Sequence, residues 1–430
     1  MTPSGESVSA HTMDAEATAH RLESPQGLAG RMFGSLKVRD FRFFITSSFA
    51  QTASMNMQGM VNGWLAYELT GSKAILGITT LGSALPQLSL SLFGGILADR
   101  LPKKLVLSLG MAALAVMTLF VAISISLGII TWHYLLINSV IQGIAMALTM
   151  PSRQALVSEI VGRDKVTNAV SLNASVMNFN QIAGPAIAGV GVAVVGIAGV
   201  YYLMAILFLI AAVAILPVRR ARTVMLSKLP TANILASIKD GLLYVRRSPV
   251  LLNVLLLSLF TVLLTMPFRN LLPVFAKDVL HVGPSRLGLL LSVSGAGALA
   301  GSLIIASLSG KGRGMLFLHT GLLAGISIIV FTFSKSYVMS LVVMTFTGLG
   351  QAGRMTLANS LVQSHTEDAY LGRVMSLLVM QMGITGVGVF IVSIIAQFAG
   401  AQIAVAGTAG LLVLITMYYY FFTPVVRKLD

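Results

Sequence analysis

The sequence predicts an all-α polytopic membrane protein with twelve transmembrane helices, arranged as two six-helix halves. Its composition indicates the membrane, because 56% of the 430 residues are hydrophobic, only 10% are charged and the mean hydropathy is +0.87. Soluble domains carry about 25% charged residues. Apolar runs recur along the chain, and each is long enough to cross about 30 Å of hydrocarbon as a helix. They lie at 43–67, 74–98, 104–127, 132–152, 170–195, 199–217, 250–275, 286–309, 314–333, 337–359, 373–397 and 401–423.

The positive charges predict the orientation of these helices. The chain has 29 Lys and Arg against 14 Asp and Glu, which gives a net charge of +15. With both termini in the cytoplasm, most of these cations fall in cytoplasmic segments, as loops rich in Lys and Arg do. The loops on the other side contain four: Lys73, Lys277, Arg286 and Lys335. The charge therefore indicates topology in a membrane, which we expect to be a plasma membrane, and does not indicate nucleic-acid binding.

Hydrophilic segments divide the chain into its expected parts. Residues 1–40 are polar and predict a disordered cytoplasmic tail, and residues 218–249 form a linker between halves at 41–217 and 250–430. Within the linker, apolar residues at helical spacing lie opposite charged ones, which fits either a helix on the inner membrane surface or a solvated linker helix. The sequence contains no cysteine, so disulfides are excluded.

The two halves resemble each other in sequence. Leu156-Val157, followed after thirteen residues by Ser171-Leu172, recurs at one constant offset as Leu361-Val362 and Ser376-Leu377. Both stretches lie on the cytoplasmic side, after spans four and ten. Internal repeats of this kind are the common construction of secondary transporters, which bind their substrate at the interface between repeats.

The loop after span two supplies a family signature. It contains Gly95, Asp99, Arg100 and Lys104 in the order of Gly-x-x-x-Asp-Arg-x-Gly-Arg-Lys, and departs from that pattern at Pro102 and at the following lysine. With the six-plus-six layout, the chain from about residue 40 onward resembles the major facilitator superfamily. The corresponding loop of the second half, 310–314, keeps the cations but has no acid.

Further motifs resemble the bacterial branch that contains the enterobactin exporter and macrolide efflux pumps. They are Trp64–Ser72 after span one, Pro151–Leu156 after span four and Asp240–Pro249 before span seven. Span five carries Gly184, Pro185 and Gly189, similar to the antiporter motif Gly-Pro-x-x-Gly-Gly with its last glycine displaced by one. Proline removes a backbone donor and glycine permits close approach, so tight packing without a gating role is an alternative interpretation.

The resemblance implies a conformational latch in the loop after span two. Asp99 ends a helix, where the negative pole disfavours an anion, so it requires an external partner. In this superfamily it docks across the two halves on the cytoplasmic side when the transporter faces outward. The expected acceptor is the N-terminus of span eleven, near Gly372 and Arg373. The alternative is that the loop serves only topology and lipid contact.

Polar side chains within the spans predict a central substrate cavity. Such side chains are costly in hydrocarbon and tend to face the protein interior. Many lie on single helix faces of spans that line the pathway in this superfamily, although hydrogen bonds between helices are an alternative role for each amide. The candidate cavity residues are Gln51, Gln58, Asn62, Asn138, Gln142, Asn180, Gln181, Arg269, Gln351, Arg354 and Gln381.

The charges within the spans favour an anionic or neutral substrate. Arg269 and Arg354 lie inside spans seven and ten, whereas every Asp and Glu near the spans is close to a span end. A pump for organic cations would be expected to place a carboxylate in its cavity. The alternative role for each arginine is a hydrogen bond to helix carbonyls. Glu68 and Asp278, at matching places after spans one and seven, are candidates for proton coupling.

Together these features predict a secondary transporter. The sequence has no phosphate-binding loop, no catalytic or metal-ligand cluster and no motif that implies a cofactor, so the chain is not expected to be an enzyme. We predict an exporter of small drug- or siderophore-like amphiphiles that works by alternating access and proton antiport, as a monomer in the lipid bilayer. The alternatives are an importer or a lysolipid or lipid flippase on the same fold, and a non-transporting membrane sensor.

Overall fold

The computed structural model describes residues 34–100, 102–162, 165–218, 234–308, 312–427 and 429; the side chains of 91–100, 234–238, 379 and 382 are not described. All regular secondary structure in these ranges is helical. The first half contains η1 (Gly34–Lys37), α3 (Arg39–Thr70), α4 (Lys73–Arg100), α5 (Lys103–Ser126), α6 (Trp132–Val161) and α7 (Val166–Ala214). The rest contains α8 (Ile234–Arg247), α9 (Pro249–Val274), the π-helical turn η3 (Phe275–Val279), α10 (Pro284–Ser307), α11 (Arg313–Phe333), α12 (Tyr337–His365), α13 (Asp368–Ala399), α14 (Ala401–Phe422) and α15 (Pro424–Arg427).

The described helices supply twelve membrane spans, because α7 provides two. Gly196 interrupts α7 with φ of +73°, a backbone conformation that glycine adopts without the penalty of a Cβ. In the described part of the chain, eight helices are long and apolar enough to cross a membrane by length and composition. The helices α3 and α12 are more polar because they carry amide and arginine side chains. These two spans carry five of the eleven candidate cavity residues, and the other six lie on spans that are apolar overall.

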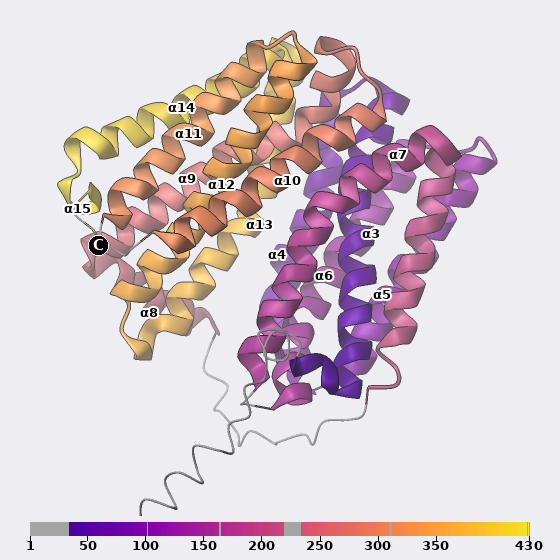
Figure 1. Ribbon diagram of the computed structural model, residues 1–430, viewed down its shortest axis with the longest axis horizontal. Helices are drawn as coiled ribbons and strands as arrows, with labels where there is room; N and C mark the ends of the chain where they lie inside the picture. The colour runs from indigo at the N-terminus through magenta and orange to yellow at the C-terminus, as the bar shows by residue number, and fades with distance from the viewer. Residues whose placement is uncertain are drawn as a thin grey trace, which may run out of the picture.

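The spans form two bundles (Figure 1). In the first half α3 packs along α7 and α4 along α6, and in the second α10 packs along α12 and α11 along α14. Equivalent glycines make equivalent contacts: a Cβ on Gly143 would overlap the carbonyl of Ser83, and one on Gly348 would overlap that of Ser294. These two glycines are separated by the same offset as the repeated Leu-Val and Ser-Leu pairs. The repeat is thus expressed in the packing of the helices.

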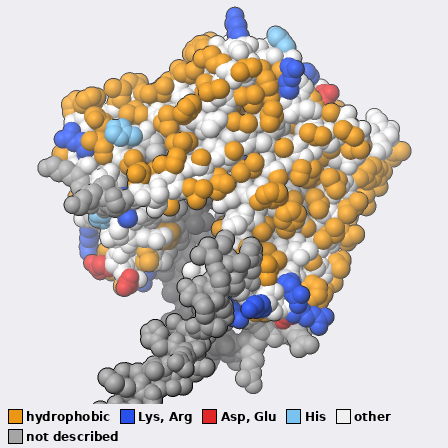
Figure 2. All heavy atoms as spheres, viewed as in Figure 1, with side chains coloured by type: hydrophobic (Ala, Val, Ile, Leu, Met, Phe, Trp, Pro, Cys, Tyr) orange, Lys and Arg blue, Asp and Glu red, His pale blue; other side chains and the backbone are white. Residues whose placement is uncertain are grey.

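The surface matches a membrane-embedded protein. In Figure 2 hydrophobic side chains cover the flank of the molecule, and charged side chains lie toward its two ends. At one end the exposed side chains Tyr418, Phe421 and Phe422 lie on the last turns of α14. At the other, Trp132 contacts His133, and Tyr134 packs edge-on against Phe120. Aromatic residues at both ends of the spans are typical of proteins that place them at the two membrane–water interfaces.

The helix α8 lies at the same end of the molecule as η1 and α15. We call this end the α8 side. The helix α8 packs on α13, where Gly241 contacts the backbone of Arg373, and Val245 is buried in a cluster with Leu251. The ring of Tyr244 stacks on that of Tyr370, with centroids 4.2 Å apart. Helical structure also begins at Gly34, within the segment expected to be a disordered tail. The tail at 1–33 and the linker at 219–233 lie outside the described residues.

Candidate functional site

The two halves are joined by side-chain hydrogen bonds at the side opposite α8. Tyr67, at the end of α3, donates its hydroxyl to Asp278 Oδ2 at 2.5 Å. Ser285, at the start of α10, donates its hydroxyl to the carbonyl of Gly189 in α7 at 2.8 Å. Gln397 of α13 accepts a backbone hydrogen bond from Lys73 of α4 at 2.8 Å. Polar contacts at this side therefore join α3 to η3, α7 to α10 and α4 to α13 across the boundary.

The seam between α7 and α10 depends on small residues. A Cβ on Gly288 would overlap the carbonyl of Pro185, and Gly189 lies against the backbone of Pro284 and Gly288. Gly184 faces inward within its own half, against Asn56 of α3. Gly184, Pro185 and Gly189 of the antiporter-like motif are all buried, and the two glycines lie at contacts that leave no space for a Cβ. Their packing role is therefore visible, and a gating role stays a prediction.

A cavity of about 340 Å³ lies between the halves. Its walls come from α3, α7, α9 and α10, and they are mostly apolar, with two prolines and three methionines. Its lining residues are Met55, Asn56, Gly59, Met60, Pro185, Met266, Arg269, Asn270, Leu272, Pro273, Leu287 and Leu291. A smaller pocket of about 30 Å³ shares Arg269, Leu272 and Leu291 with it and reaches Gln181 and Gln351. The flexible thioether side chains give this cavity walls that adapt to irregular ligands.

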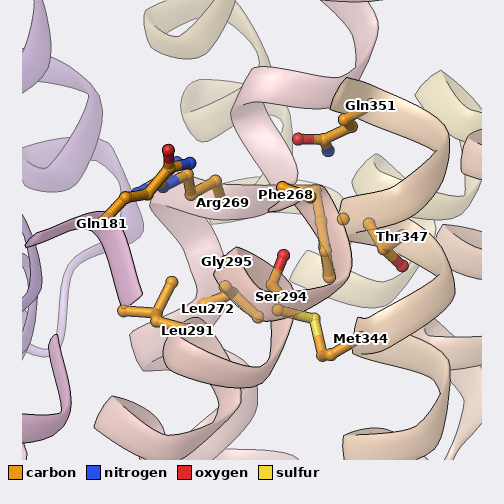
Figure 3. Close-up of a pocket in the computed structure, with 12 residues that line it drawn as sticks. Gln181, Phe268, Arg269, Leu272, Leu291, Ser294, Gly295, Met344, Thr347 and Gln351 are labelled. Carbon is orange, nitrogen blue, oxygen red and sulfur yellow. The ribbon is translucent and has the colours of Figure 1, made fainter. Parts of the chain in front are cut away.

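Arg269 is the charged residue at the centre of this site. Its side chain is exposed and lines the cavity, beside the partly buried Met266 and Asn270 of the same helix. Figure 3 shows the Gln181 amide of α7 beside the Arg269 side chain, so groups from both halves meet here. Among the described residues no hydrogen bond or ion pair to the Arg269 guanidinium is found. The site therefore offers a cation and amide groups to a ligand, against apolar walls.

Arg354 does not line the cavity, and the expectation that it does is corrected. Its guanidinium is buried between α9, α11 and α12, where Nη1 donates to the carbonyl of Leu257 at 3.0 Å and Nη2 to that of Ser258 at 3.3 Å. It also lies over the ring of Phe317, 5.6 Å from the centroid. The alternative role, hydrogen bonding to helix carbonyls, is therefore the one observed.

Three of the candidate amides make hydrogen bonds within one half. Asn180 donates to the carbonyl of Phe49 at 3.0 Å, and Gln381 donates to that of Leu255 at 3.1 Å. Asn62 accepts a hydrogen bond from the hydroxyl of Tyr201. These side chains join neighbouring helices in this conformation, which is the alternative that the sequence left open for each amide.

The other six candidate amides differ in their surroundings. Gln181 and Gln351 line the smaller pocket, and a contact with substrate stays a prediction for both. Gln51, Gln58 and Asn138 are buried in the first half, and the amide groups of Gln58 and Asn138 have no hydrogen-bond partner among the described residues. Gln142 is partly buried and is not among the residues that line either cavity.

The latch residues are only partly described. Gly95, Asp99 and Arg100 end α4, and their side chains lie outside the described ones. Lys104 donates to the carbonyls of Leu216 and Val218, at 2.7 and 3.3 Å. Its neighbour Lys103 forms an ion pair with Glu159. The expected acceptor Arg373 is exposed and lies over the ring of Tyr370, 5.2 Å from its centroid.

The two candidates for proton coupling differ in their surroundings. Glu68 is exposed at the end of α3. Asp278 is also exposed but accepts the hydrogen bond from Tyr67, and the Nζ atom of Lys277 lies 5.8 Å from the centroid of the Tyr67 ring. Asp278 therefore belongs to the contact between the halves. A role in proton coupling stays a prediction for both.

Sequence reasoning missed several residues that join the halves. Asn270, next to Arg269, lies 3.0 Å from the Thr80 hydroxyl of α4 and lines the larger cavity. Gln397 and Tyr67 bridge the halves near the ends of their helices. A polar residue at the end of a span has no distinctive spacing, and the one related signal was the matching position of Asp278 and Glu68, the neighbour of Tyr67, after spans seven and one.

Comparison with known proteins agrees with this architecture. Residues 31–430 match the family model described as transmembrane secretion effectors. The chain belongs to this family, within the major facilitator superfamily of membrane transporters. It is 24% identical over 385 residues to the staphyloferrin A transporter of Staphylococcus aureus, covering 88% of this chain and 95% of that protein. Over 119 residues, 28% of this chain and 29% of the relative, it is 30% identical to the quinolone resistance protein NorA of the same species.

Solved structures show the same fold. A bacterial homologue of the human lysosomal transporter Spinster, in an inward-facing and unoccupied conformation, matches with a TM-score of 0.72 over 91% of this chain and 97% of the other, at 12% identity. The nucleoside transporter NupG, solved as a mutant, matches with a TM-score of 0.72 over 89% of this chain and all of the other, at 14% identity. The family match, together with this fold, makes the protein a membrane-embedded transporter of a small molecule.

Proposed function

We propose that the protein exports small amphiphilic molecules with an anionic or neutral head, by alternating access. The observation that carries this proposal is the Arg269 guanidinium, which lies in the cavity between the halves without a counter-ion among the described residues. A cation at membrane depth is costly unless it is paired or hydrated. A ligand that brings an anionic group to Arg269 therefore gains more from this site than a cationic ligand does.

The rest of the cavity favours an apolar body attached to that head. Leucine, proline and methionine side chains form most of its wall, and Asn56 and Asn270 add amide groups. A volume of about 340 Å³ is at the lower end of the range for drug-sized ligand sites. Relatives named for a siderophore and for quinolone resistance support ligands of this general size and polarity.

The conformation supports loading from the cytoplasm. With the termini in the cytoplasm, as the positive charges favour, the hydrogen bonds that join the halves at Tyr67, Gly189 and Gln397 lie on the outer side. The bundles diverge toward the α8 side in Figure 1. We therefore assign this structure as inward-facing. For the source of energy we propose proton antiport, as the resemblance to the antiporter motif implies.

Efflux of a matched pair of substrates tests the proposal. A fluorescent quinolone carboxylate and its methyl ester differ only in the anionic group. In inside-out vesicles with an imposed pH gradient, the protein should transport the carboxylate in preference to the ester. Arg269→Gln should reduce transport of the carboxylate about 10- to 100-fold, since hydrogen bonds to charged groups contribute about 1.5–3 kcal/mol, and should leave the ester nearly unaffected.

Arg286→Gln is the matched control, because Arg286 is an exposed arginine of the same half whose guanidinium lies over Tyr337, outside the cavity. It should leave both substrates unchanged. Equal loss of carboxylate and ester in Arg269→Gln would contradict recognition of the anion. Transport only in right-side-out vesicles would identify an importer, and exchange of labelled lysolipid between leaflets without quinolone transport would identify a flippase. No flux of any of these would favour the non-transporting sensor.

A further inference from the structure

The N-terminus of α4 is capped by a side chain from the other half of the molecule. The backbone N–H groups of Lys73 and Ala74 donate to Gln397 Oε1, at 2.8 and 3.4 Å, and the hydroxyl of Ser72 donates to the same oxygen at 3.3 Å. The first four N–H groups of a helix have no acceptor within the helix, and this end carries partial positive charge. The amide oxygen of Gln397 therefore satisfies donors that α4 cannot satisfy by itself.

This cap exists only while α4 and α13 are in contact on the outer side. Gln397 lies in the last turn of α13, and the two helices run antiparallel across the boundary. Their contact continues inward, where Gly386 meets Ala84 and Gly383 meets Leu88 with no space for a Cβ. If the halves separate at the outer side, the N–H groups of Lys73 and Ala74 lose this acceptor and must turn to water.

We propose that Gln397 is a cross-half helix cap that stabilises the inward-facing conformation and is released when the protein opens outward. The proposal rests on alternating access, as argued under Proposed function, but not on the identity of the substrate. It adds a positioning residue on the outer side, where the sequence indicated no latch.

The cap is the counterpart of the latch expected on the cytoplasmic side. There, Asp99 at the end of α4 is expected to dock on the N-terminus of α13, and Gly372 and Arg373 near that N-terminus are exposed. Because α4 and α13 are antiparallel, each helix ends near the start of the other. Gln397 of α13 would then cap α4 in the inward-facing conformation, and Asp99 of α4 would cap α13 in the outward-facing conformation.

Distance measurements on the purified full-length protein test the cap without any substrate. The natural sequence has no cysteine, so spin labels can be attached at introduced cysteines alone. Ile129→Cys with Lys335→Cys reports the outer side, and Ser158→Cys with Ser364→Cys reports the α8 side; all four residues are exposed. The ratio of inward- to outward-facing populations is then read from the two distance distributions in lipid nanodiscs.

Gln397→Met should lower this ratio about five-fold, since loss of an N-capping oxygen typically costs about 1 kcal/mol. Gln397→Glu keeps the oxygen and adds a negative charge at a helix N-terminus, so it should raise the ratio. Gln402→Met is the matched control. Gln402 donates to the carbonyl of Thr332 at 3.2 Å, and both residues belong to the second half, so its removal should not change the ratio.

An unchanged ratio in Gln397→Met, or a change equal to that of Gln402→Met, would overturn the proposal. Elution as a single species and an unaltered thermal midpoint confirm that each variant is folded, and Gln397→Glu provides a second measurement of opposite sign. Failure of carboxylate transport by the natural protein would count against the proposed function alone. The distance distributions would still decide the role of Gln397.

Discussion

Two arginines in the membrane helices of the second half have opposite surroundings. Arg354 is buried and donates to the carbonyls of Leu257 and Ser258, whereas Arg269 is exposed to the cavity and has no such partner among the described residues. Both carry the same charge in the same kind of segment. The comparison shows that an arginine within a span has either a structural or a ligand-binding role, and that hydrogen-bond partners distinguish the two.

Replacement of Arg354 should produce the largest loss of stability. Arg354→Met removes the contacts with α9 and with the ring of Phe317, and leaves a poorly filled space in a packed interior. We expect a destabilisation on the order of 3 kcal/mol, as for other large truncations in cores. A clear fall in the thermal midpoint in detergent would show this. An unchanged thermal midpoint together with loss of transport would indicate that Arg354 acts on the substrate and not in packing.

The same substitution at Arg269 should have the opposite profile. Arg269→Met removes a cation that the structure does not use in packing, so the thermal midpoint should change little. Binding of a quinolone carboxylate should weaken by about 10-fold or more, since the lost contact is to a charged group. Tryptophan fluorescence titration measures the affinity, and Arg269→Lys should recover part of it. A fall in stability similar to that of Arg354→Met would remove the distinction between the two arginines.

Sequence reasoning predicted the fold well and the site in part, for a physical reason. Hydrophobic length and positive-inside charge depend on composition, so the twelve spans and the family follow directly from the residues. The depth of a residue in a span follows from the same pattern, but its direction depends on helix rotation and on partners far away in the chain. The sequence therefore placed Arg354 and Gln381 in the cavity, although both donate to carbonyl groups of α9. It gave no signal for Gln397, because the partners of that side chain are backbone N–H groups of α4, which every residue type carries.

A smaller effect is expected at the outer contact between the halves. Tyr67→Phe removes the hydrogen bond to Asp278 and leaves the ring in place beside Lys277. The loss should be about 1 kcal/mol, typical of a single hydrogen bond, and should favour the outward-facing conformation. Spin labels on the outer side would show a longer mean distance. Because the same contact involves a carboxylate, an unaltered distribution at neutral pH would indicate that Asp278 does not help to close this side.

The smallest change is expected for the unpartnered amides of the first half, which extend the comparison of the two arginines to neutral groups. Asn138 is fully buried and its amide has no hydrogen-bond partner among the described residues, whereas Asn180 donates to Phe49 and lies 2.6 Å from the Thr52 hydroxyl. An apolar residue of similar size in place of an unpaired buried amide is neutral or stabilising. Asn138→Leu should therefore leave the thermal midpoint unchanged or raise it slightly. Asn180→Leu should destabilise the protein by about 1–3 kcal/mol and so lower the midpoint.

If Asn138→Leu instead destabilised the protein as much as Asn180→Leu, the Asn138 amide would have a hydrogen-bond partner in the folded protein, such as a bound water. If Asn138→Leu had normal stability but slowed transport, the Asn138 amide would instead form its hydrogen bond in the outward-facing conformation.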